Sequence, residues 1–277
     1  MAFSEPHLHG VSRTLFVTLA ARARGAALFP HLGFQDPAAE AVCDALGIDP
    51  AQFARTAECV YGVVRRSMVI DEIVARFADE HGAATVLNLA AGLSTTFERA
   101  GRADLSWFDL DLAEPAALHR TLIAPAPARR LVVGDIGRPG WTQGLSLPPG
   151  PLLVIAEGIM PYLTVDCVAG LLDELGAGFA DRPLRLAYDT FAFTMVGMAR
   201  LHPSIGPLAR TDPSIEFRSG VRSMSDYAVG RADWPLRDVT PVMEGMGPLH
   251  SLACLGFSAA FGVPFYAVAV LDHHPRG

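Results

Sequence analysis

The chain has 277 residues, of which 51% are hydrophobic and 18% charged, so it can bury a sizeable core and is not intrinsically disordered. Its net charge of -7 argues against a general nucleic-acid partner, because neutralising phosphates requires a basic face. All 22 basic residues are arginine, which excludes a Schiff-base lysine, pyridoxal attachment and a P-loop lysine.

The first part of the sequence has helical apolar spacing. Residues 12–29, 38–48 and 61–82 repeat apolar side chains at helical intervals, and Gly82 is a candidate helix stop. No basic region precedes an apolar core at the start, so we expect no signal peptide and a cytoplasmic protein. We predict a helical N-terminal extension over residues 1–82, packed on a core formed by residues 83–277.

Short apolar runs replace this pattern after residue 83. They lie at residues 84–90, 105–110, 130–135, 151–157 and 183–189, and helix-like segments separate several of them. Strands that are apolar on both faces and alternate with helices predict an α/β fold with a mostly parallel sheet covered on both sides. After Asp189 the spacing loosens, and we expect an inserted lid or binding wall over about 191–233.

The last uncharged stretch lies between Glu244 and Asp272 and is long enough to span a bilayer. Because Gly256, Gly262 and Pro264 interrupt it, we predict instead a short buried helix, a turn and a final core strand, with no membrane partner.

Cysteines and histidines give no sign of a metal site. The four cysteines form no Cys-x-x-Cys pair, and we expect reduced core residues. His273 and His274 follow Asp272 without a third placed ligand, so we expect no metal.

Acidic residues follow three of the predicted strands: Asp111 the second, Asp135 the third and Glu157 the fourth. Ligands of open α/β sheets bind at the carboxyl ends of the strands, where Asp111 would accept from ribose hydroxyls and Asp135 from the adenine amine. Acids at such positions are also common as helix caps, which is the alternative for each one alone.

The loop after the first strand, Ala90-Ala91-Gly92, contains a single glycine. A dinucleotide pyrophosphate needs Gly-x-Gly-x-x-Gly, so an NAD-dependent oxidoreductase is the weaker alternative. S-adenosyl-L-methionine has no phosphate, and Arg66 would pair with its carboxylate as a bidentate donor. A solvated helix face is the alternative for Arg65 and Arg66.

The segments "RRSMVIDEIV", "VLNLAAGLSTTFERAG" and "AEGIMPYL" resemble the leucine carboxyl methyltransferase and tetracenomycin-type O-methyltransferase family, a branch of the class I methyltransferases with a Rossmann-like sheet. The likeness runs over residues 12–191. It implies S-adenosyl-L-methionine as the cofactor. The cofactor-binding residues that it implies are Arg66, Asn88, Ala90, Ala91, Gly92, Asp111, Leu112, Asp135, Ile136, Glu157 and Gly158. Arg22 is a looser match to a basic residue of the family.

Two positions depart from the family pattern. Ala90 replaces the usual first glycine, and Ser94 replaces the usual Asp after "GL". The extra methyl of Ala90 would crowd the cofactor if the backbone there has positive φ. An inactive binding relative is therefore an open alternative.

The acceptor side is predicted from chemistry. A carboxylate acceptor needs a clamp, for which Arg218 and Arg222 are candidates with Tyr162 as a donor. A hydroxyl acceptor benefits from a general base, for which His202 is the candidate. Phe191, Phe193, Met195 and Met198 would form an apolar wall, or ordinary helix core.

The sequence thus predicts an O-methyltransferase of secondary metabolism that methylates a carboxylate or hydroxyl of a small apolar, polyketide-like metabolite. A C-terminal carboxylate of a peptide or protein is an alternative acceptor, and a homodimer is left open.

Overall fold

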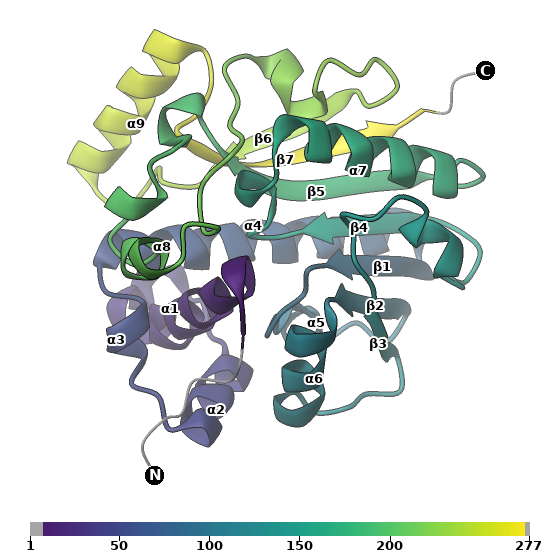
Figure 1. Ribbon diagram of the computed structural model, residues 1–277, viewed down its shortest axis with the longest axis horizontal. Helices are drawn as coiled ribbons and strands as arrows, with labels where there is room; N and C mark the ends of the chain where they lie inside the picture. Colours follow the sequence, from purple (N-terminus) through teal and green to yellow (C-terminus); the bar gives the residue numbers. More distant parts are fainter. Residues whose placement is uncertain (1–7, 275–277) are drawn as a thin grey trace.

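A computed structural model describes residues 8–274, in which a seven-stranded sheet forms the centre of the protein (Figure 1). The strands are β1 (Ala84–Leu89), β2 (Leu105–Asp111), β3 (Arg129–Val133), β4 (Leu152–Ala156), β5 (Leu184–Phe191), β6 (Leu236–Pro241) and β7 (Tyr266–His273). Their order is β3-β2-β1-β4-β5-β7-β6, with β7 antiparallel to both of its neighbours. The mostly parallel sheet predicted from the sequence is confirmed.

Helices cover both faces of this sheet. On one face, Ile70 and Phe77 of α4 (Ala57–His81) pack in one apolar cluster with Val86 of β1. On the other face, Leu172 of α7 (Val165–Gly178) packs in a second cluster with Leu87 of β1. Because consecutive residues of a strand point to opposite faces, the continuous apolar run of β1 supplies both layers of the core.

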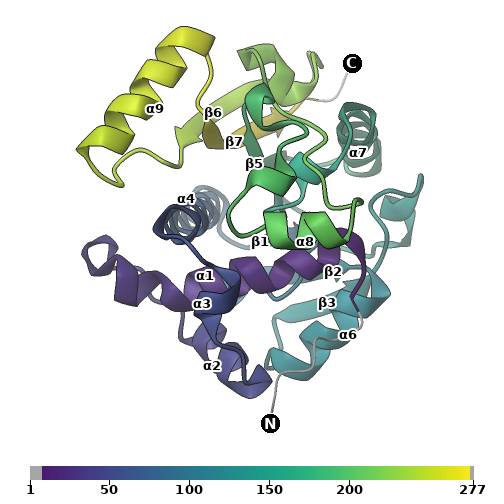
Figure 2. The same ribbon diagram turned by 60° about the vertical axis from the view of Figure 1, so that its left-hand side comes forward.

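Helices also make up most of the described segment before β1. α1 (Leu15–Leu28), α2 (Pro37–Leu46) and the short α3 (Pro50–Phe53) lie beside one another, with α1 against α4 (Figure 2). α4 begins where the Thr56 side chain accepts a hydrogen bond from the Cys59 N–H, and it ends at Gly82, whose φ is 68°. The predicted stop at Gly82 is therefore confirmed.

The remaining helical segments are mostly short; two lie in the described segment before β1, and the others lie between strands. They are η1 (Gly10–Thr14), η2 (Pro30–Leu32), α5 (Thr96–Ala100), α6 (Ala113–Leu122), η3 (Trp141–Gly144), η4 (Met160–Tyr162), η5 (Phe193–Met195), η6 (Ala199–Leu201), α8 (Gly206–Thr211), η7 (Met224–Ala228) and α9 (Pro248–Phe261). Four of them lie between β5 and β6, where the sequence loses its regular spacing.

Two features near the C-terminus differ from expectation. β6 was not predicted, because its charged and half-exposed residues and its terminal Pro241 suit a sheet edge rather than a buried run. α9 was expected to be buried, but no residue of it is; Leu249 is 81% exposed and Leu252 is 67% exposed. The uncharged composition of α9 thus marks an apolar surface helix.

Other expectations concern membranes, cysteines and metals. Among residues 8–274 no helix is both long and apolar enough to cross a bilayer. The four cysteines are free thiols, but Cys167 is exposed and Cys254 only half-buried, so the expectation of four core cysteines is wrong for these two. In the same part of the chain, no group of three or more His, Cys, Asp or Glu side chains could hold a metal ion.

Candidate functional site

The loops that follow β1 to β4 meet at the carboxyl ends of these strands, because the strands are parallel and paired with little offset. A cavity of about 300 Å³ lies at these strand ends, and we call it the strand-end pocket. All of the proposed cofactor residues line it: Arg66, Asn88, Ala90, Ala91, Gly92, Asp111, Leu112, Asp135, Ile136, Glu157 and Gly158. Arg22 of α1 lines it as well.

The turn after β1 is held to the end of β2 through one carboxylate. Asp111 Oδ2 accepts the Gly92 N–H at 2.6 Å, and its Oδ1 accepts the Leu112 N–H at 2.7 Å. Burial raises the pKa of Asp111, although these two hydrogen bonds oppose the rise. Because each carboxylate oxygen can accept further bonds, Asp111 is fixed in place and still able to accept from a diol.

Ala90 has a φ of 50°, a left-handed backbone conformation that favours glycine. We expect the methyl group of Ala90 to crowd a ligand if φ is positive, and the structure meets this condition. Gly92, in the same turn, has a φ of 51° and pays no such steric cost. The turn therefore has positive φ at two positions, as a glycine-rich loop would, although only one of the two is glycine.

A buried polar network holds the turn after β1 through the carbonyl oxygen of Gly92. Asn88 Nδ2 and Trp107 Nε1 both donate to Asp109 Oδ1 at 2.9 Å. His119 lies 3.7 Å from the other oxygen of Asp109, and its Nδ1 lies 2.8 Å from the carbonyl oxygen of Gly92. Asn88 thus lines the pocket while its amide is committed to Asp109.

Asp135 is the least enclosed of the three predicted acids. Its side chain is 41% exposed and pairs with Arg138 at 3.2 Å. It also accepts the Gly137 N–H, as expected for an acid in a tight turn. Together with Ile136, it places one polar and one apolar side chain at the outer end of the pocket.

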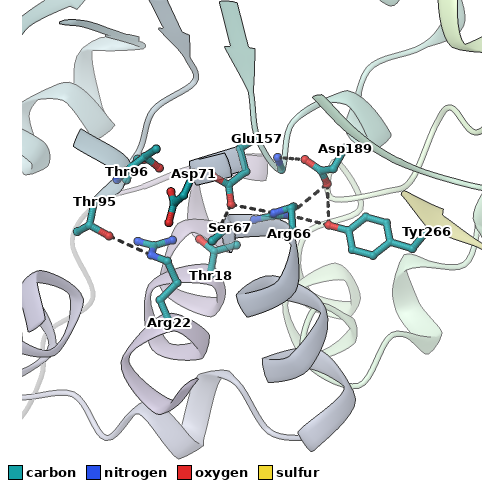
Figure 3. Close-up of polar contacts among 12 residues, drawn as sticks. Thr18, Arg22, Arg66, Ser67, Asp71, Thr95, Thr96, Glu157, Asp189 and Tyr266 are labelled. Carbon is teal, nitrogen blue, oxygen red and sulfur yellow. Dashed lines mark hydrogen bonds and ion pairs between the residues drawn. The ribbon is translucent and has the colours of Figure 1, made fainter. Parts of the chain in front are cut away.

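Arg66 is the centre of a buried ion-pair network (Figure 3). Its Nε donates to Glu157 Oε1 at 2.9 Å, and its Nη1 donates to Asp189 Oδ2 at 3.2 Å and to the Tyr266 hydroxyl at 3.0 Å. Ser67 Oγ adds a second hydrogen bond to Glu157 Oε1. The alternative of a solvated helix face is therefore wrong for Arg66, which is buried.

Glu157 is ionised in this setting. Burial alone would raise the pKa of Glu157, but the guanidiniums of Arg66, Arg22 and Arg99 lower it below its usual value. The acid after the fourth strand is thus an ion-pair partner that faces the strand-end pocket, rather than a helix cap.

Arg22 belongs to a neighbouring network. Its Nε donates to Asp36 and Thr95, and its Nη2 donates to the Leu93 carbonyl at 2.6 Å. Asp36 also pairs with Arg99 at 2.7 Å. In Figure 3, Arg22 from α1 lies on one side of Glu157 and Arg66 from α4 lies on the other.

A second cavity of about 550 Å³ adjoins the first, and we call it the apolar pocket. Both cavities are bounded by Thr14, Thr18, Arg66 and Gly158. The other walls of the apolar pocket come mainly from hydrocarbon and aromatic side chains, among them Val17, Val63, Phe191, Met195, Met198, Phe217 and Phe265. Three of the four predicted wall residues, all but Phe193, are in this lining.

The two arginines predicted as a carboxylate clamp do not line either pocket. Arg218 is exposed and donates its backbone N–H to the Pro161 carbonyl. Arg222 is also exposed, with its guanidinium 4.7 Å from the ring centre of Phe193. The hypothesis of a clamp from this insertion is therefore not supported, because neither arginine lines the strand-end pocket or the apolar pocket.

His202 does line the apolar pocket, but its chemistry does not suit a general base. Burial lowers the pKa of His202 to about 4. Its Nδ1 accepts the N–H groups of Ser204 and Ile205, which leaves the proton on Nε2. His202 therefore presents a neutral N–H donor.

Tyr162, the predicted donor, also lines the apolar pocket. Burial raises the pKa of Tyr162 far above its usual value, so its hydroxyl keeps its proton. Its ring lies 5.4 Å from that of Phe217.

Asp189 and Tyr266 are site residues that the sequence interpretation missed. Asp189 Oδ1 accepts the Gly158 N–H, and its Oδ2 accepts from Tyr266 at 2.8 Å. The rule that selected the other three acids applies to Asp189, which lies near the end of β5. Tyr266 could not be found in this way. It starts β7 and lies beside the end of β5 only because the two strands are antiparallel.

The strand order and the pocket at the ends of β1 to β4 define a class I methyltransferase fold. A family model for leucine carboxyl methyltransferases matches residues 15–176, more than half of the chain. The chain belongs to the leucine carboxyl methyltransferase family.

Curated relatives agree with this assignment. The chain is 32% identical over 190 residues to the S-adenosyl-L-methionine-dependent methyltransferase dpfgK of Gibberella zeae, with 63% of each protein covered. It is 32% identical over 162 residues to the tetracenomycin polyketide synthesis O-methyltransferase TcmP of Streptomyces glaucescens, with 56% of this chain and 57% of the relative covered. The chain thus matches less than two thirds of the length of either relative.

A solved structure supports the fold over almost the whole chain. A candidate methyltransferase from Thermobifida fusca superposes with a TM-score of 0.57 at 17% identity, covering 98% of this chain and 96% of its own.

Proposed function

We propose that the protein is an S-adenosyl-L-methionine-dependent O-methyltransferase that acts on a carboxylate or hydroxyl of a small apolar acceptor. The observation that carries this proposal is the meeting of two unlike cavities at Arg66. One cavity is lined by strand-end acids and arginines, and the other by hydrocarbon and aromatic side chains. A nucleoside cofactor suits the first cavity and an apolar acceptor suits the second.

The residues of the strand-end pocket fit this cofactor group by group. Asp111 would accept from the ribose hydroxyls, and Asp135 with Ile136 would hold the adenine. Arg66 has its Nε and Nη1 committed to acids, while Nη2, on the same edge of the guanidinium as Nε, can donate to the methionine carboxylate with Arg22. Glu157 would accept from the methionine amine. The relatives' dependence on S-adenosyl-L-methionine supports the same choice.

The bound sulfonium supplies an activated methyl group, so the protein's main task is to align the acceptor and exclude water. Thr14, Thr18 and Gly158 lie where the pockets adjoin, and transfer would take place beside them. The buried walls of the apolar pocket would keep water from the reacting atoms.

Calorimetry with S-adenosylhomocysteine and with NADH tests the proposed cofactor. We expect micromolar binding of the first and none of the second. Binding of NADH alone would support an oxidoreductase, and binding of neither would support an inactive relative. Transfer of radiolabelled methyl groups to a metabolite or peptide pool then tests the activity. Base-labile product would indicate an ester, as from a carboxylate of a metabolite or peptide, and base-stable product an ether.

A further inference from the structure

The geometry points to His202 as a specificity-determining residue, whose Nε2–H binds a second, uncharged oxygen of the acceptor about 10 Å from the oxygen that receives the methyl group. The acceptor is then an elongated apolar molecule with an oxygen near each end. This inference rests on the proposed function and holds whether a carboxylate or a hydroxyl is methylated. The direction of the His202 ring and the length of the apolar pocket carry it.

The His202 ring is oriented by the turn that follows it. Its Nδ1 accepts the N–H of Ser204 at 3.3 Å and that of Ile205 at 3.1 Å, so the proton of the neutral ring lies on Nε2. The ring also stands edge-on to Phe217, with centroids 6.1 Å apart and planes at 85°. Because the two nitrogens of an imidazole diverge, Nε2 points away from the turn.

This nitrogen is free to bind a ligand. Among residues 8–274 no group hydrogen-bonds to Nε2, and Nε2 is not one of the unpaired polar atoms that the protein encloses completely. His202 lines the apolar pocket, whose walls are mainly hydrocarbon and aromatic. A ligand oxygen would pair with the N–H, whereas a hydrocarbon in the same place would leave it desolvated and unpaired.

The apolar pocket extends along one face of α4. The lining residues from this helix and its N-cap recur at intervals of three or four, as on one side of a helix: Thr56, Cys59, Val63 and Arg66. Arg66 also bounds the strand-end pocket, so the methyl group would be transferred at this end. At a rise of about 1.5 Å per residue, Cys59 lies about 10 Å from Arg66 along the helix.

His202 belongs to the end of the apolar pocket that is remote from Arg66. The turn after His202 packs on the start of α4, where Ser204 Oγ accepts the Arg55 N–H at 3.2 Å and interacts with the Cys59 thiol. His202 and Arg66 are therefore separated by about two turns of α4, which sets the distance between the two oxygens of the acceptor.

Tyr162 is a second neutral donor of the apolar pocket, and it belongs to the Arg66 end. Its hydroxyl interacts with Thr14, which bounds both pockets. The ring of Phe217 lies between the two donors, 5.4 Å from the ring of Tyr162 and 6.1 Å from that of His202. The apolar pocket thus has a neutral donor toward each end, with hydrocarbon between them.

The charges of the apolar pocket favour an uncharged oxygen at the His202 end. Arg66 and its partner Asp189 lie at the other end, where the sulfonium of the cofactor would also lie. Glu58, exposed beside Cys59 at the start of α4, is the charged residue that lines the outer end. A carbonyl-type oxygen can take the His202 N–H without placing a second anion near Glu58.

Two pairs of biphenyl probes test the inference. One para position carries a hydroxyl in the first pair and a carboxylate in the second, for the Arg66 end. The opposite para position carries acetyl or isopropenyl, which has the same shape with CH2 in place of the oxygen. Calorimetry with the full chain saturated with S-adenosylhomocysteine should show, in each pair that binds, the acetyl probe about threefold to tenfold tighter.

Equal or weaker binding of the acetyl probe, or no binding of any probe, would overturn the inference. Failure of S-adenosylhomocysteine itself to bind would instead overturn the proposed function.

Two variants separate the Nε2–H from the order of the turn. In His202→Asn the side-chain oxygen can still accept from Ser204 and Ile205, but the amide is too short to reach the position of Nε2. In His202→Gln the amide nitrogen can reach that position, but the turn loses its acceptor. We expect His202→Asn to lose the preference for acetyl and His202→Gln to keep it. Retention of the preference in His202→Asn would overturn the inference.

Tyr162→Phe is the matched control, because it removes the neutral donor of the Arg66 end. It should change the affinities of both probes of a pair alike and leave their ratio as in the unaltered protein. A change of the ratio as large as that in His202→Asn would place the acetyl group at the Arg66 end and contradict the role of His202.

The carbonyl stretch of the bound acetyl probe tests the hydrogen bond in the unaltered protein, where no variant has to fold. Infrared difference spectra should place this stretch below its frequency in a hydrocarbon solvent, as for a carbonyl that accepts a hydrogen bond. A hydrocarbon-like frequency would overturn the inference.

Discussion

The strand-end pocket and the apolar pocket differ in what holds their walls. In the strand-end pocket, Asp111 is fixed by backbone N–H groups at 2.6 and 2.7 Å, and Glu157 by Arg66 and Ser67. In the apolar pocket, rings and methionines are held by packing, as where Phe191 lies 5.1 Å from Phe217. Hydrogen bonds fix directions, whereas apolar packing fixes mainly volume.

This difference indicates how each pocket can change. A pocket defined by directed hydrogen bonds fits one ligand chemistry, and replacing one of its groups leaves others unpaired. A pocket defined by packed side chains accepts volume-conserving replacements at little cost. We therefore expect substitutions around the apolar pocket to alter acceptor choice, and those around the strand-end pocket to alter cofactor affinity.

Arg66 belongs to both pockets, and its removal should have the largest effect. Arg66→Ala leaves Glu157 and Asp189 buried without their cation, which typically destabilises a protein by about 3–5 kcal/mol. Urea unfolding should show this loss, and calorimetry should show no S-adenosylhomocysteine binding.

Arg65→Ala is the control for Arg66→Ala, since Arg65 is half-buried on the same helix and contacts Met68. It should change the free energy of unfolding by less than about 0.5 kcal/mol. A similarly small loss for Arg66→Ala would contradict the joint role of this residue.

His202 should make the apolar pocket sensitive to acid. Burial lowers its pKa to about 4 in the folded protein, against about 6.5 for a solvent-exposed histidine, so below pH 6.5 the unfolded state binds more protons. The free energy of unfolding should therefore fall by about 2–3 kcal/mol between pH 7 and pH 4 on account of His202. Urea unfolding across this range measures it.

The His202→Asn variant should lack that part of the pH dependence, while its side-chain oxygen can still accept from Ser204 and Ile205. His250→Asn, at an exposed position, is the control and should keep the wild-type slope. Identical slopes for all three proteins would show that His202 is not buried as a neutral group.

On the cofactor side, Asp111→Ala should weaken S-adenosylhomocysteine binding by about 1–3 kcal/mol, through lost ribose contacts and a loosened turn at Gly92. Asp135→Ala should have a smaller effect, because that side chain is 41% exposed and already pairs with Arg138. Calorimetry on the two variants gives the comparison. If Asp135→Ala weakened S-adenosylhomocysteine binding as much as Asp111→Ala or more, the assignment of Asp111 to the ribose would be wrong.

The fold was predictable because its signals are local. Each parallel strand contains a short apolar stretch, and Gly82 marks the end of α4. β6 was missed because an edge strand with charged and half-exposed residues has no such run. α9 was misplaced because its apolar composition does not tell whether another element covers it.

The site was predictable to the extent that it follows the strands. Asp111, Asp135 and Glu157 each lie within two residues of a strand end, so strand positions alone placed them together. Arg218 and Arg222 were misplaced because side-chain direction in an irregular segment depends on tertiary contacts. Tyr266 required the direction of β7 to be known.

Ala90 offers the smallest and most local test. At a φ of 50° its methyl group strains the backbone, and Ala90→Gly should relieve about 1–2 kcal/mol of strain against the larger entropy that glycine loses on folding. The net gain in the free energy of unfolding should be about 0.5–1 kcal/mol, with S-adenosylhomocysteine affinity kept or improved. Ala91→Gly, the adjacent residue without positive φ, should instead lose about 0.5–1 kcal/mol. Both variants replace alanine by glycine in the same turn. If the free energy of unfolding rose in both variants or in neither, backbone strain at Ala90 would not be the cause of the difference.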